Sequence, residues 1–369
     1  MKICHIVENL NTGGLETVVI GLILEQIKNN HECIVICLFE EGELAYKLSG
    51  SDVNIVACGK TPGFHPHSVI KMRKTLNSFS PDVIHTHNNV AHIYCCLSTL
   101  LMACPIINTK HGLGAESTSK QARLFRLTRW KTSQYTFVSR DAMLSYIKRN
   151  LVPENKSMVL HNGIDISVIP QRNTEAKKNY LHDVGIEDSP VLIVMISRLN
   201  RLKDHQTLLL AFSRLLQQEK IQCKLVIIGD GETRDQIAAE VNKLDLQGNV
   251  ILSGNKPDAY QLLQCFDIFV LSSHSEGHSI ALLEAAAAGL PLIATDVGGN
   301  REIVNEDMGI LVKHEDVDEL KNALVCLVKD RSDREMKGSR ASVWAHDNAS
   351  VAAMALSYSN LYNKHRDIR

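Results

Sequence analysis

The sequence predicts an α/β protein made of two doubly wound domains, and three observations support this expectation. The chain has 369 residues, whereas a single hydrophobic core usually stops growing at about 250–300 residues. Short apolar, β-rich runs alternate with longer helical patterns, as in parallel sheets covered by helices. A polar stretch over residues 171–188 separates a first β/α series from a second.

The first series predicts a buried parallel sheet. Its apolar runs are continuous rather than alternating, which is typical of strands covered on both faces. The expected strands are 2–7, 33–39, 53–57, 82–86, 105–109, 135–138 and 157–160. Helical patterns fill gaps between them, at Leu15–Lys28, Val69–Phe79 and Val90–Met102.

The second series predicts another sheet of the same kind. Its expected strands are 191–196, 223–228, 249–253, 267–271, 291–294 and 309–312. Helices are expected at Gln206–Gln217, Arg234–Leu244, Ile280–Ala288 and Val317–Val328, followed by a helical tail over about 331–365. We therefore expect two Rossmann-like domains, 1–165 and 166–347. Because ligands of doubly wound sheets bind beyond the carboxyl ends of the strands, two such domains facing each other make a central cleft.

The composition argues against several classes of protein. With a net charge of −1, the chain shows no nucleic-acid signature. Basic residues are in excess in the N-terminal half and acidic residues in the C-terminal half, which suggests different partners for the two. None of the ten cysteines forms a CxxC pair, so neither a zinc knuckle nor a redox motif is indicated.

The sequence shows no signal for export or membrane insertion. It begins with a strand-like run, Lys2–Val7, without the apolar core and cleavage site of a signal peptide. The longest apolar stretch, Val90–Ile107, contains polar residues and falls short of the about 20 apolar residues that a spanning helix needs. We expect a cytoplasmic protein that can still sit on a membrane surface.

A glycine pair follows the first expected strand, in Asn11-Thr-Gly-Gly-Leu15. Gly13 and Gly14 allow the backbone to approach a ligand closely, and the following helix start favours an anion. A plain glycine turn is the equally weighted alternative. The GxGxxG fingerprint is absent here, which disfavours a nicotinamide oxidoreductase.

Two cations follow the first strand of the second domain. Arg198 and Lys203 lie in Ser197-Arg-Leu-Asn-Arg-Leu-Lys203, at the expected mouth of the cleft. Two fixed positive charges suit a diphosphate and neutralise charge that builds up on a leaving nucleotide diphosphate. Gly229 lies in a further loop of this edge, directly after the expected strand 223–228.

Two carboxylates frame the loop and helix after strand 267–271. Glu276 lies in the loop, and Glu284 lies in an otherwise apolar helix, where an unpaired carboxylate is costly to bury. Their separation suits two ends of one elongated ligand, such as a sugar and a ribose. Between them, the N–H groups near Ser279 and Ile280 open a helix and suit a phosphate.

The histidines do not predict a metal site. His111 in Lys110-His111-Gly112 follows strand 105–109 and points toward the expected cleft, although a structural histidine is the alternative. His85-Thr-His87 lacks an acidic or thiol partner at suitable spacing. Asp316-Val-Asp318 has the spacing of a metal-binding pair but opens a helix, where acidic residues are ordinary caps.

Taken together, these motifs resemble the family-four retaining glycosyltransferases, also called glycosyl transferases group 1, which have the GT-B fold. The resemblance covers nearly the whole chain. It depends on the Glu-x7-Glu motif of Glu276 and Glu284, the pair Arg198 and Lys203, and the hinge Asn162-Gly-Ile-Asp165. It implies a C-terminal helix, about 348–365, that packs back on the first domain. That domain would bind the acceptor and 166–347 the nucleotide-sugar donor.

The resemblance also implies a role for each candidate residue. Arg198 and Lys203 would hold the donor diphosphate, Glu276 hydroxyls of the transferred sugar, and Glu284 the donor ribose. His111 would face the donor sugar near the reacting carbon. The remaining donor-binding candidates are loop and helix-start residues, namely Gly13, Gly14, Gly229, Ser279 and Ile280.

The reaction implied is transfer from a nucleotide diphosphate sugar, with uridine as the expected base, in cell-surface polysaccharide biosynthesis. A retaining, metal-independent reaction without a cofactor is a family inference, in which the leaving phosphate oxygen accepts the acceptor's proton. The motif departs from many relatives at His278-Ser279, and this pair is a candidate for tuning sugar choice. A nucleotide-sugar epimerase of the same fold and a non-catalytic sugar-nucleotide binding protein remain alternatives.

The acceptor side carries a basic segment, 120–131, in which no acidic residue occurs. Arg123, Arg126 and Arg129 recur at spacing three, opposite apolar residues and next to Trp130. This pattern suits an anionic membrane surface and hence a lipid-linked acceptor. An ordinary surface helix that packs its apolar face inward is the alternative.

Overall fold

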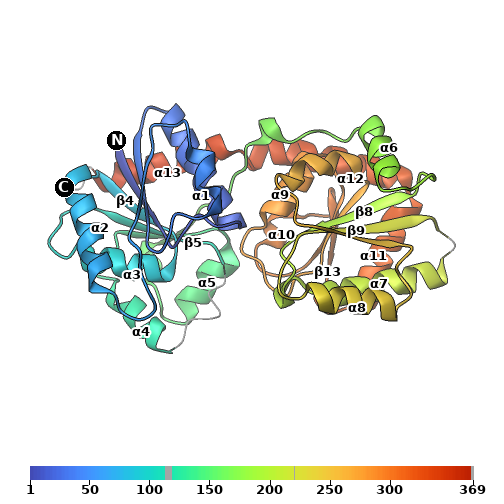
Figure 1. Cartoon of the computed structure of the whole chain (residues 1–369), viewed down its shortest axis with the longest axis horizontal. Coiled ribbons are helices and arrows are strands. Elements are labelled where there is room, and N and C mark those ends of the chain that lie inside the picture. Colours follow the sequence, from blue (N-terminus) through green and yellow to red (C-terminus); the bar gives the residue numbers. More distant parts are fainter. Residues whose placement is uncertain (113–118, 220, 367–369) are drawn as a thin grey trace. The chain divides into compact units, whose positions relative to one another are not determined.

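The structure is a computed structural model that describes the backbone of residues 1–112, 119–219 and 221–366. The chain divides into two compact units (Figure 1). Unit 1 comprises Met1–Ile164 and the C-terminal helix from Val351, and unit 2 comprises Asp165–Ser350.

Unit 1 is built on a parallel sheet of seven strands in the order β3-β2-β1-β4-β5-β6-β7. The strands are β1 (Lys2–Val7), β2 (Glu32–Cys37), β3 (Asn54–Ala57), β4 (Val83–Thr86), β5 (Ile106–Lys110), β6 (Gln134–Phe137) and β7 (Ser157–Val159). The residues of the five inner strands are almost entirely buried, as the continuous apolar runs predict, whereas the edge strands β3 and β7 are only partly buried.

Helices cover both faces of this sheet. Helices α1 (Gly14–Lys28) and α13 (Val351–Arg366) pack together on one face, and α2 (Pro66–Phe79) and α3 (Asn89–Ser98) pack together on the other (Figure 1). The remaining helices are α4 (Ser119–Leu127) and α5 (Arg140–Lys148). The core under α2 and α3 takes alternate strand residues, such as Cys4, Ile6 and Ile84, so the residues between them point toward α1 and α13.

Unit 2 repeats the plan with the strand order β10-β9-β8-β11-β12-β13, again parallel. The strands are β8 (Val191–Ile196), β9 (Cys223–Ile228), β10 (Val250–Gly254), β11 (Ile268–Leu271), β12 (Leu292–Thr295) and β13 (Gly309–Val312). The helices are α6 (Thr174–Asp183), α7 (His205–Gln218), α8 (Arg234–Lys243), α9 (Ile280–Ala287), α10 (Asn300–Ile303), α11 (Val317–Lys329) and α12 (Arg331–Asn348).

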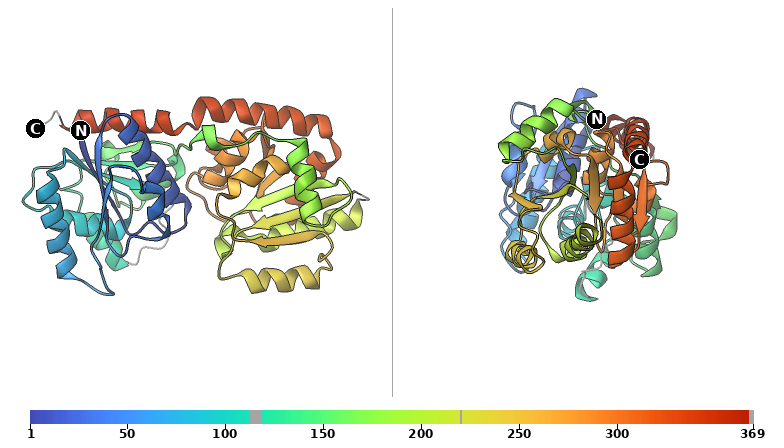
Figure 2. Two further views of the ribbon diagram at one scale, coloured as in Figure 1. Left: turned by 45° about the horizontal axis from the view of Figure 1, so that its top comes forward. Right: turned by 90° about the vertical axis from the view of Figure 1, so that its right-hand side faces the viewer.

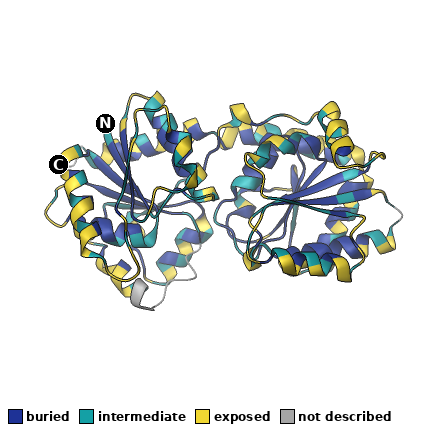
Figure 3. Cartoon of the chain, in the orientation of Figure 1, coloured by how far each residue is buried: buried dark blue, intermediate teal, exposed yellow. Residues whose placement is uncertain are grey.

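The helices of unit 2 form two groups around its sheet. Helix α7 packs with α8 and α11, while α9 packs with α12, and the two groups lie on opposite faces (Figure 1). Buried residues line the strands and the inward sides of the helices, whereas the outer sides are exposed (Figure 3). Both units therefore confirm the predicted doubly wound α/β architecture.

The structure differs from the expected elements in two places. The polar stretch 171–188 contains helix α6, which Asn173 caps by accepting from the Glu175 amide at 2.8 Å. Its apolar pattern is weak because Leu181 is its only buried residue among the described ones. The expected tail is two helices, α12 and α13, and Figure 2 shows the interruption. It falls where unit 2 ends at Ser350 and unit 1 resumes at Val351.

Each sheet has a switch point at which the strand order reverses. In unit 1, β1 lies between β2 and β4, and in unit 2, β8 lies between β9 and β11. At such a point, the loops that follow two adjacent strands lead to helices on opposite faces of the sheet. A crevice therefore opens beyond the carboxyl ends of these two strands. The loops after β1, β4, β8 and β11 are therefore where ligand-binding residues belong.

Candidate active site

The switch point of unit 2 brings Lys203 and Glu276 together. The Lys203 Nζ lies 2.6 Å from Glu276 Oε1, and the Ser273 hydroxyl donates to the same oxygen at 2.6 Å. Glu276 is only 9% exposed and Lys203 22%. A charge-assisted contact in such a sheltered place is stronger than one in open water. The loops after β8 and β11 thus present a fixed cation and carboxylate together.

Backbone contacts hold the Lys203 turn against the loop after β11. Lys203 ends a short 3-10 turn, Arg201–Lys203, and Asp204 then caps α7 by accepting from the Thr207 amide at 3.2 Å. The Ser272 hydroxyl lies 3.0 Å from the Lys203 carbonyl oxygen. These contacts fix the direction in which Lys203 leaves the backbone.

Two glycines allow close backbone approach at this edge. At Gly229, φ is +143°, and a Cβ atom would lie 1.9 Å from the Ser197 carbonyl oxygen. At Gly298, φ is +52°, and a Cβ atom would lie 1.9 Å from the Glu276 carbonyl oxygen. Any other residue would push the strand-end loops apart. Gly229 is a donor-binding candidate from the sequence, whereas Gly298, in the loop after β12, was given no role of its own.

Helix α9 begins at the same edge. Ser279 is its cap and accepts from the Leu282 amide at 3.4 Å, and Ile280 is its first residue. The early N–H groups of a helix lack partners within the helix and favour an anion. Glu284 lies further along α9 and is half-buried, although Leu282, Leu283, Ala285 and Ala286 around it are buried.

Arg198 is exposed, directly after the Ser197 that meets Gly229. Its place in a diphosphate clamp stays a prediction. A hollow of about 450 Å³ lies beside the pair rather than over it, with Arg201, Asp204 and His274 in its lining.

In unit 1, the glycine pair starts helix α1. Gly13 is the cap residue, with an extended φ of −176°, and Gly14 is the first helical residue. Gly13 has no side chain with which to cap the first N–H groups of α1. A helix start at the switch point favours an anion, and this position is compatible with both interpretations made from the sequence.

The next strands of unit 1 end in a buried lysine and a histidine. Lys110 is 3% exposed, donates to Asn89 Oδ1, and holds its ammonium 3.9 Å from the centre of the Phe125 ring. Burial lowers the pKa of the Lys110 ammonium well below its usual value. Burial, and then the charge of Lys110, lower the pKa of His111 to about 3, so its imidazole is neutral at pH 7.

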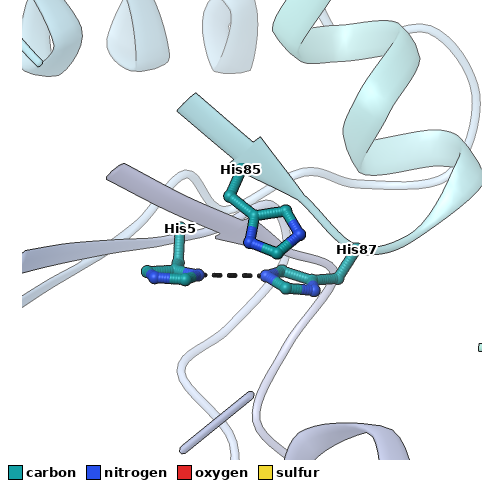
Figure 4. Close-up of side chains that lie close together, drawn as sticks. All are labelled: His5, His85 and His87. Carbon is teal, nitrogen blue, oxygen red and sulfur yellow. Dashed lines mark hydrogen bonds between the residues drawn. The ribbon is translucent and has the colours of Figure 1, made fainter. Parts of the chain in front are cut away.

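His111 is the outermost member of a histidine cluster. Its Nε2 lies 3.2 Å from His87 Nδ1. His5 on β1 and His85 on β4 lie opposite each other in register, and His87 follows two residues later. Figure 4 shows that the His5, His85 and His87 rings lie close together, with a hydrogen bond between a nitrogen of His5 and a nitrogen of His87. The cluster faces Gln26 of α1 and Tyr362 of α13.

Among the residues that the structure describes, two groups of side chains have ligand atoms close enough together for a metal ion. His5, His85 and His87 form a buried group, and His274, His314 and Glu315 form a more exposed one. The expectation that the reaction needs no metal stays a prediction. Asp316, in contrast, has an ordinary role as the cap of α11, because its Oδ1 accepts from the Asp318 and Glu319 amides.

The basic segment 120–131 is partly committed to internal contacts. Arg126 and Arg129 donate to backbone carbonyls of residues 149–151, beyond the C-terminal end of α5. Lys120 lies outside the described side chains. Leu127 and Trp130 nevertheless remain 68% and 67% exposed.

Among the described helices, none is long and apolar enough to cross a bilayer.

Sequence reasoning did not find His5, His87, Gln26 or Ser273 as site residues. A signal existed for the histidines, because His5 interrupts an apolar strand and His85-Thr-His87 places two imidazoles on one face. No sequence pattern indicated that His5 contacts Gln26. That contact depends on how α1 packs on the sheet.

Two family models match the chain. The model described as Glycosyltransferase Family 4 matches residues 12–168. The model described as Glycosyl transferases group 1 matches residues 176–344. Together they span most of both units, and they fall in the order in which the two sheets follow each other.

Two enzymes are among the known proteins of similar sequence. The chain is 28% identical over 276 residues to a UDP-Gal:alpha-D-GlcNAc-diphosphoundecaprenol alpha-1,3-galactosyltransferase of Escherichia coli, covering 72% of this chain and 70% of the relative. It is 26% identical over 299 residues to an N-acetyl-alpha-D-glucosaminyl L-malate synthase of Bacillus anthracis, covering 79% and 77%.

A solved structure has the same fold. HepE of Anabaena, in complex with UDP-glucose, superimposes with a TM-score of 0.87 over 99% of this chain and 100% of that one, at 20% sequence identity.

Proposed function

Because the chain belongs to the family-four glycosyltransferases, we propose that it transfers a sugar from a UDP-sugar to a lipid-linked saccharide, with retention of anomeric configuration. The pathway proposed is cell-surface polysaccharide biosynthesis. The observation that carries the proposal is the Lys203–Glu276 pair at the switch point of unit 2. A cation and a carboxylate held together suit a donor that carries a diphosphate beside sugar hydroxyls.

The donor is assigned to unit 2. Lys203 and Arg198 neutralise the diphosphate, and the first N–H groups of α9, at Ser279 and Ile280, hold a phosphate oxygen. Glu276 accepts from hydroxyls of the transferred sugar. Glu284, half-buried on the same helix, accepts from the ribose hydroxyls. Gly229 supplies the close backbone approach.

The proposed reaction needs no enzyme base. The acceptor hydroxyl oxygen forms a bond to the anomeric carbon on the face from which UDP leaves. The bond from that carbon to the diphosphate oxygen breaks, and the electron pair stays on UDP. The acceptor proton passes to the leaving phosphate oxygen. Lys203 stabilises the negative charge that grows there, which is where preorganised charge lowers the barrier most.

The acceptor is assigned to unit 1. Gly13 and Gly14 offer backbone donors at its switch point, and neutral His111 offers a ring nitrogen to a substrate hydroxyl. A lipid-linked acceptor is supported by the Escherichia coli relative, whose name states a diphosphoundecaprenol acceptor. The exposed apolar side chains of Leu127 and Trp130 support it independently, because such groups insert into a membrane interface.

A donor screen with EDTA present tests the donor side. The protein is incubated with uridine, guanosine and adenosine diphosphate sugars, while thermal stability and slow release of nucleotide diphosphate are measured. We expect one UDP-sugar to stabilise the fold and to be hydrolysed without a divalent ion. Release that stops in EDTA and returns with Mg²⁺ or Mn²⁺ contradicts metal independence.

The same screen separates the alternatives. An epimerase returns an isomerised nucleotide sugar and no free nucleotide diphosphate. A non-catalytic binding protein is stabilised by the nucleotide sugar and releases nothing, even with a lipid-linked saccharide present. The configuration of the transferred sugar, read by NMR of the product, decides between retention and inversion.

Co-sedimentation with liposomes tests the membrane contact. We expect binding at low salt to vesicles that contain anionic lipid, and weaker binding for Leu127→Ser and Trp130→Ser. Leu356→Ser is the matched control, because Leu356 is a similarly exposed leucine on α13, at 62%. If the folded protein stays in solution at low salt, the membrane part of the proposal is wrong.

A further inference from the structure

A continuous chain of side-chain contacts runs from helix α1 to His111. The Gln26 Oε1 lies 2.8 Å from His5 Nε2. The His5 Nδ1 lies 3.0 Å from His87 Nε2, a contact drawn in Figure 4. The His87 Nδ1 lies 3.2 Å from His111 Nε2. Each distance is at or near that of a direct hydrogen bond. Gln26 and His5 are fully buried, and His87 is 3% exposed.

The three imidazoles of this chain are neutral at pH 7. Burial lowers the pKa of His5 to about 4 and that of His111 to about 3. Burial also lowers the pKa of His87 well below its usual value. A neutral imidazole has one N–H donor and one unprotonated acceptor nitrogen. Once the donor and the acceptor of the first hydrogen bond are known, the protonated nitrogen of every imidazole in the row is therefore determined.

The Gln26 amide oxygen, which can only accept, determines which atoms donate in the following hydrogen bonds. Its amide oxygen also receives the Cys33 thiol, at 3.7 Å. Burial raises the pKa of Cys33 to about 12, so the thiol keeps its proton and donates. The amide oxygen accepts from His5 Nε2–H, which leaves His5 Nδ1 as an acceptor. His87 Nε2–H then donates to His5.

The last step of the chain concerns His111. His87 Nδ1 is left as an acceptor, so His111 donates from Nε2. The proton of the neutral His111 ring is then on Nε2, and its Nδ1 is unprotonated. This Nδ1 is buried and has no hydrogen-bond partner in the described part of the chain.

We propose that Gln26, His5 and His87 act as a positioning relay that holds His111 with its proton on Nε2 and offers Nδ1 as an acceptor for a substrate hydroxyl. The substrate role of His111 rests on the proposed transferase function, whereas the hydrogen-bonded chain does not. His5, His87 and Gln26 are positioning residues, because they act through His111.

His85 and the C-terminal helix brace the relay. The His85 ring centre lies 4.0 Å from that of His87, and its Nδ1 lies 2.6 Å from the Tyr362 hydroxyl of α13. Its Nε2 lies 2.6 Å from the Thr109 hydroxyl. The α13 contact thus holds the His85 ring beside that of His87.

The geometry of the cluster favours hydrogen bonds over a metal ion. The His5 and His87 rings are nearly parallel, at 14°, and their facing nitrogens are 3.0 Å apart, which leaves no space for an ion between them on that line. Both nitrogens of His85 already have hydroxyl partners. Metal analysis of the purified protein is nevertheless part of the test.

Nitrogen NMR of protein labelled with ¹⁵N-histidine tests the relay without any substrate. We expect a slowly exchanging Nε2–H signal for His111, an unprotonated Nδ1, and couplings across the His5–His87 and His87–His111 hydrogen bonds. The His111→Asn variant, whose spectrum lacks the signals of this ring, assigns them.

Two substitutions of His87 distinguish the relay from simple packing. Asparagine carries its amide oxygen near the position of Nδ1 and can still accept from His111, whereas glutamine reaches the position of Nε2 and cannot. We expect His87→Gln to lower kcat for the UDP-sugar found in the donor screen by about tenfold. His87→Asn should restore most of this activity, and neither should change UDP affinity.

His92→Gln is the matched control, because His92 is another fully buried histidine of unit 1 and contacts threonine hydroxyls and the Cys96 thiol. It tests whether loss of any buried imidazole lowers kcat. If His92→Gln lowers kcat as His87→Gln does, the effect is one of packing and the relay is wrong.

Other outcomes also overturn the proposal. They are a His111 proton on Nδ1, absence of the coupling between His87 and His111, and about one metal ion per chain bound to the cluster. If the couplings are present but no nucleotide sugar is consumed, the transferase proposal is wrong, and so is the substrate role of His111. The hydrogen-bonded relay is still supported in that case. Because the spectra use the unmodified protein, the relay is tested even if the variants do not fold.

Discussion

Lys203 and Glu276 are 73 positions apart in the chain, and their side chains meet at 2.6 Å. They meet because β8 and β11 are neighbours at the switch point of unit 2 and both run toward the same edge. Ser273 donates to the same Glu276 oxygen. The pair therefore behaves as one unit, and changes at either member should affect the other.

Replacing Lys203 should chiefly reduce turnover. If the proposed function holds, Lys203→Ala removes a fixed cation from beside the growing charge on UDP, and we expect kcat to fall by about 10²–10³-fold. Steady-state kinetics with the UDP-sugar measure this. Arg201→Ala, on the same turn but exposed, should keep nearly full activity. Unchanged turnover in Lys203→Ala removes Lys203 from the clamp.

The pair also predicts non-additive effects. Lys203→Ala leaves the buried Glu276 carboxylate without its cation, which is costly, whereas Glu276→Gln removes that charge. The double variant should therefore lose less stability than the sum of the two single variants. Urea unfolding of all four proteins measures the coupling, and strictly additive free energies would argue that the pair contributes nothing.

Glu284 should contribute to donor affinity rather than to turnover. A hydrogen bond to a charged group contributes about 1.5–3 kcal/mol, so Glu284→Ala should weaken UDP binding by about tenfold or more. Isothermal titration with UDP measures this. Glu187→Ala, an exposed glutamate of the same unit, serves as the control. The ribose assignment fails if Glu284→Ala binds UDP as tightly as the parent protein.

Gly298 should tolerate no side chain. An added Cβ would lie 1.9 Å from the Glu276 carbonyl oxygen, and φ is +52°, a conformation that costs other residues about 1–2 kcal/mol before any clash. We expect Gly298→Ala to destabilise unit 2 by more than 2 kcal/mol and to weaken donor binding. Gly248→Ala, where a Cβ meets nothing within 4 Å, should change neither. Urea unfolding and UDP titration compare the two.

The buried histidines should make unit 1 sensitive to acid. His5 has a pKa of about 4 in the folded chain, whereas an unfolded histidine titrates near 6.5. As the pH falls from 6.5 to 4, the unfolded state binds the proton first, so stability is lost across this window. The full loss from His5 is about 3 kcal/mol. This stability is regained as the pH rises above 6.5.

Hydrogen exchange of the β1 amides between pH 7 and pH 5, corrected for intrinsic rates, measures the part of this loss that occurs above pH 5. His5→Gln should flatten the dependence relative to the parent protein, because glutamine does not titrate. Equal pH dependence in the two proteins would show that other groups cause it.

Much of the fold was predictable because its signals are local. The continuous apolar runs mark strands buried on both faces, and nearly all the expected strands lie within two residues of the observed ones. Helix α6 was missed because it is short and buries little apolar surface. The position of the break between α12 and α13 depends on where the chain leaves one unit for the other.

The basic segment shows the limit of reading charge from a sequence. Arg126 and Arg129 looked like membrane-facing cations, but they donate to carbonyl oxygens of residues 149–151. Spacing on a helix predicts which side chains share a face. It does not predict whether another element supplies their partners.

The sequence by itself determined the two β/α series, the loops at the strand ends and the motif residues Arg198, Lys203, Glu276 and Glu284, because strand burial and loop position follow from local patterns. Only the tertiary structure decided that Lys203 pairs with Glu276 and that Gln26, His5 and His87 connect to His111. These contacts join residues from different strands and helices. Their partners are chosen by strand order and by helix packing, which no local pattern encodes.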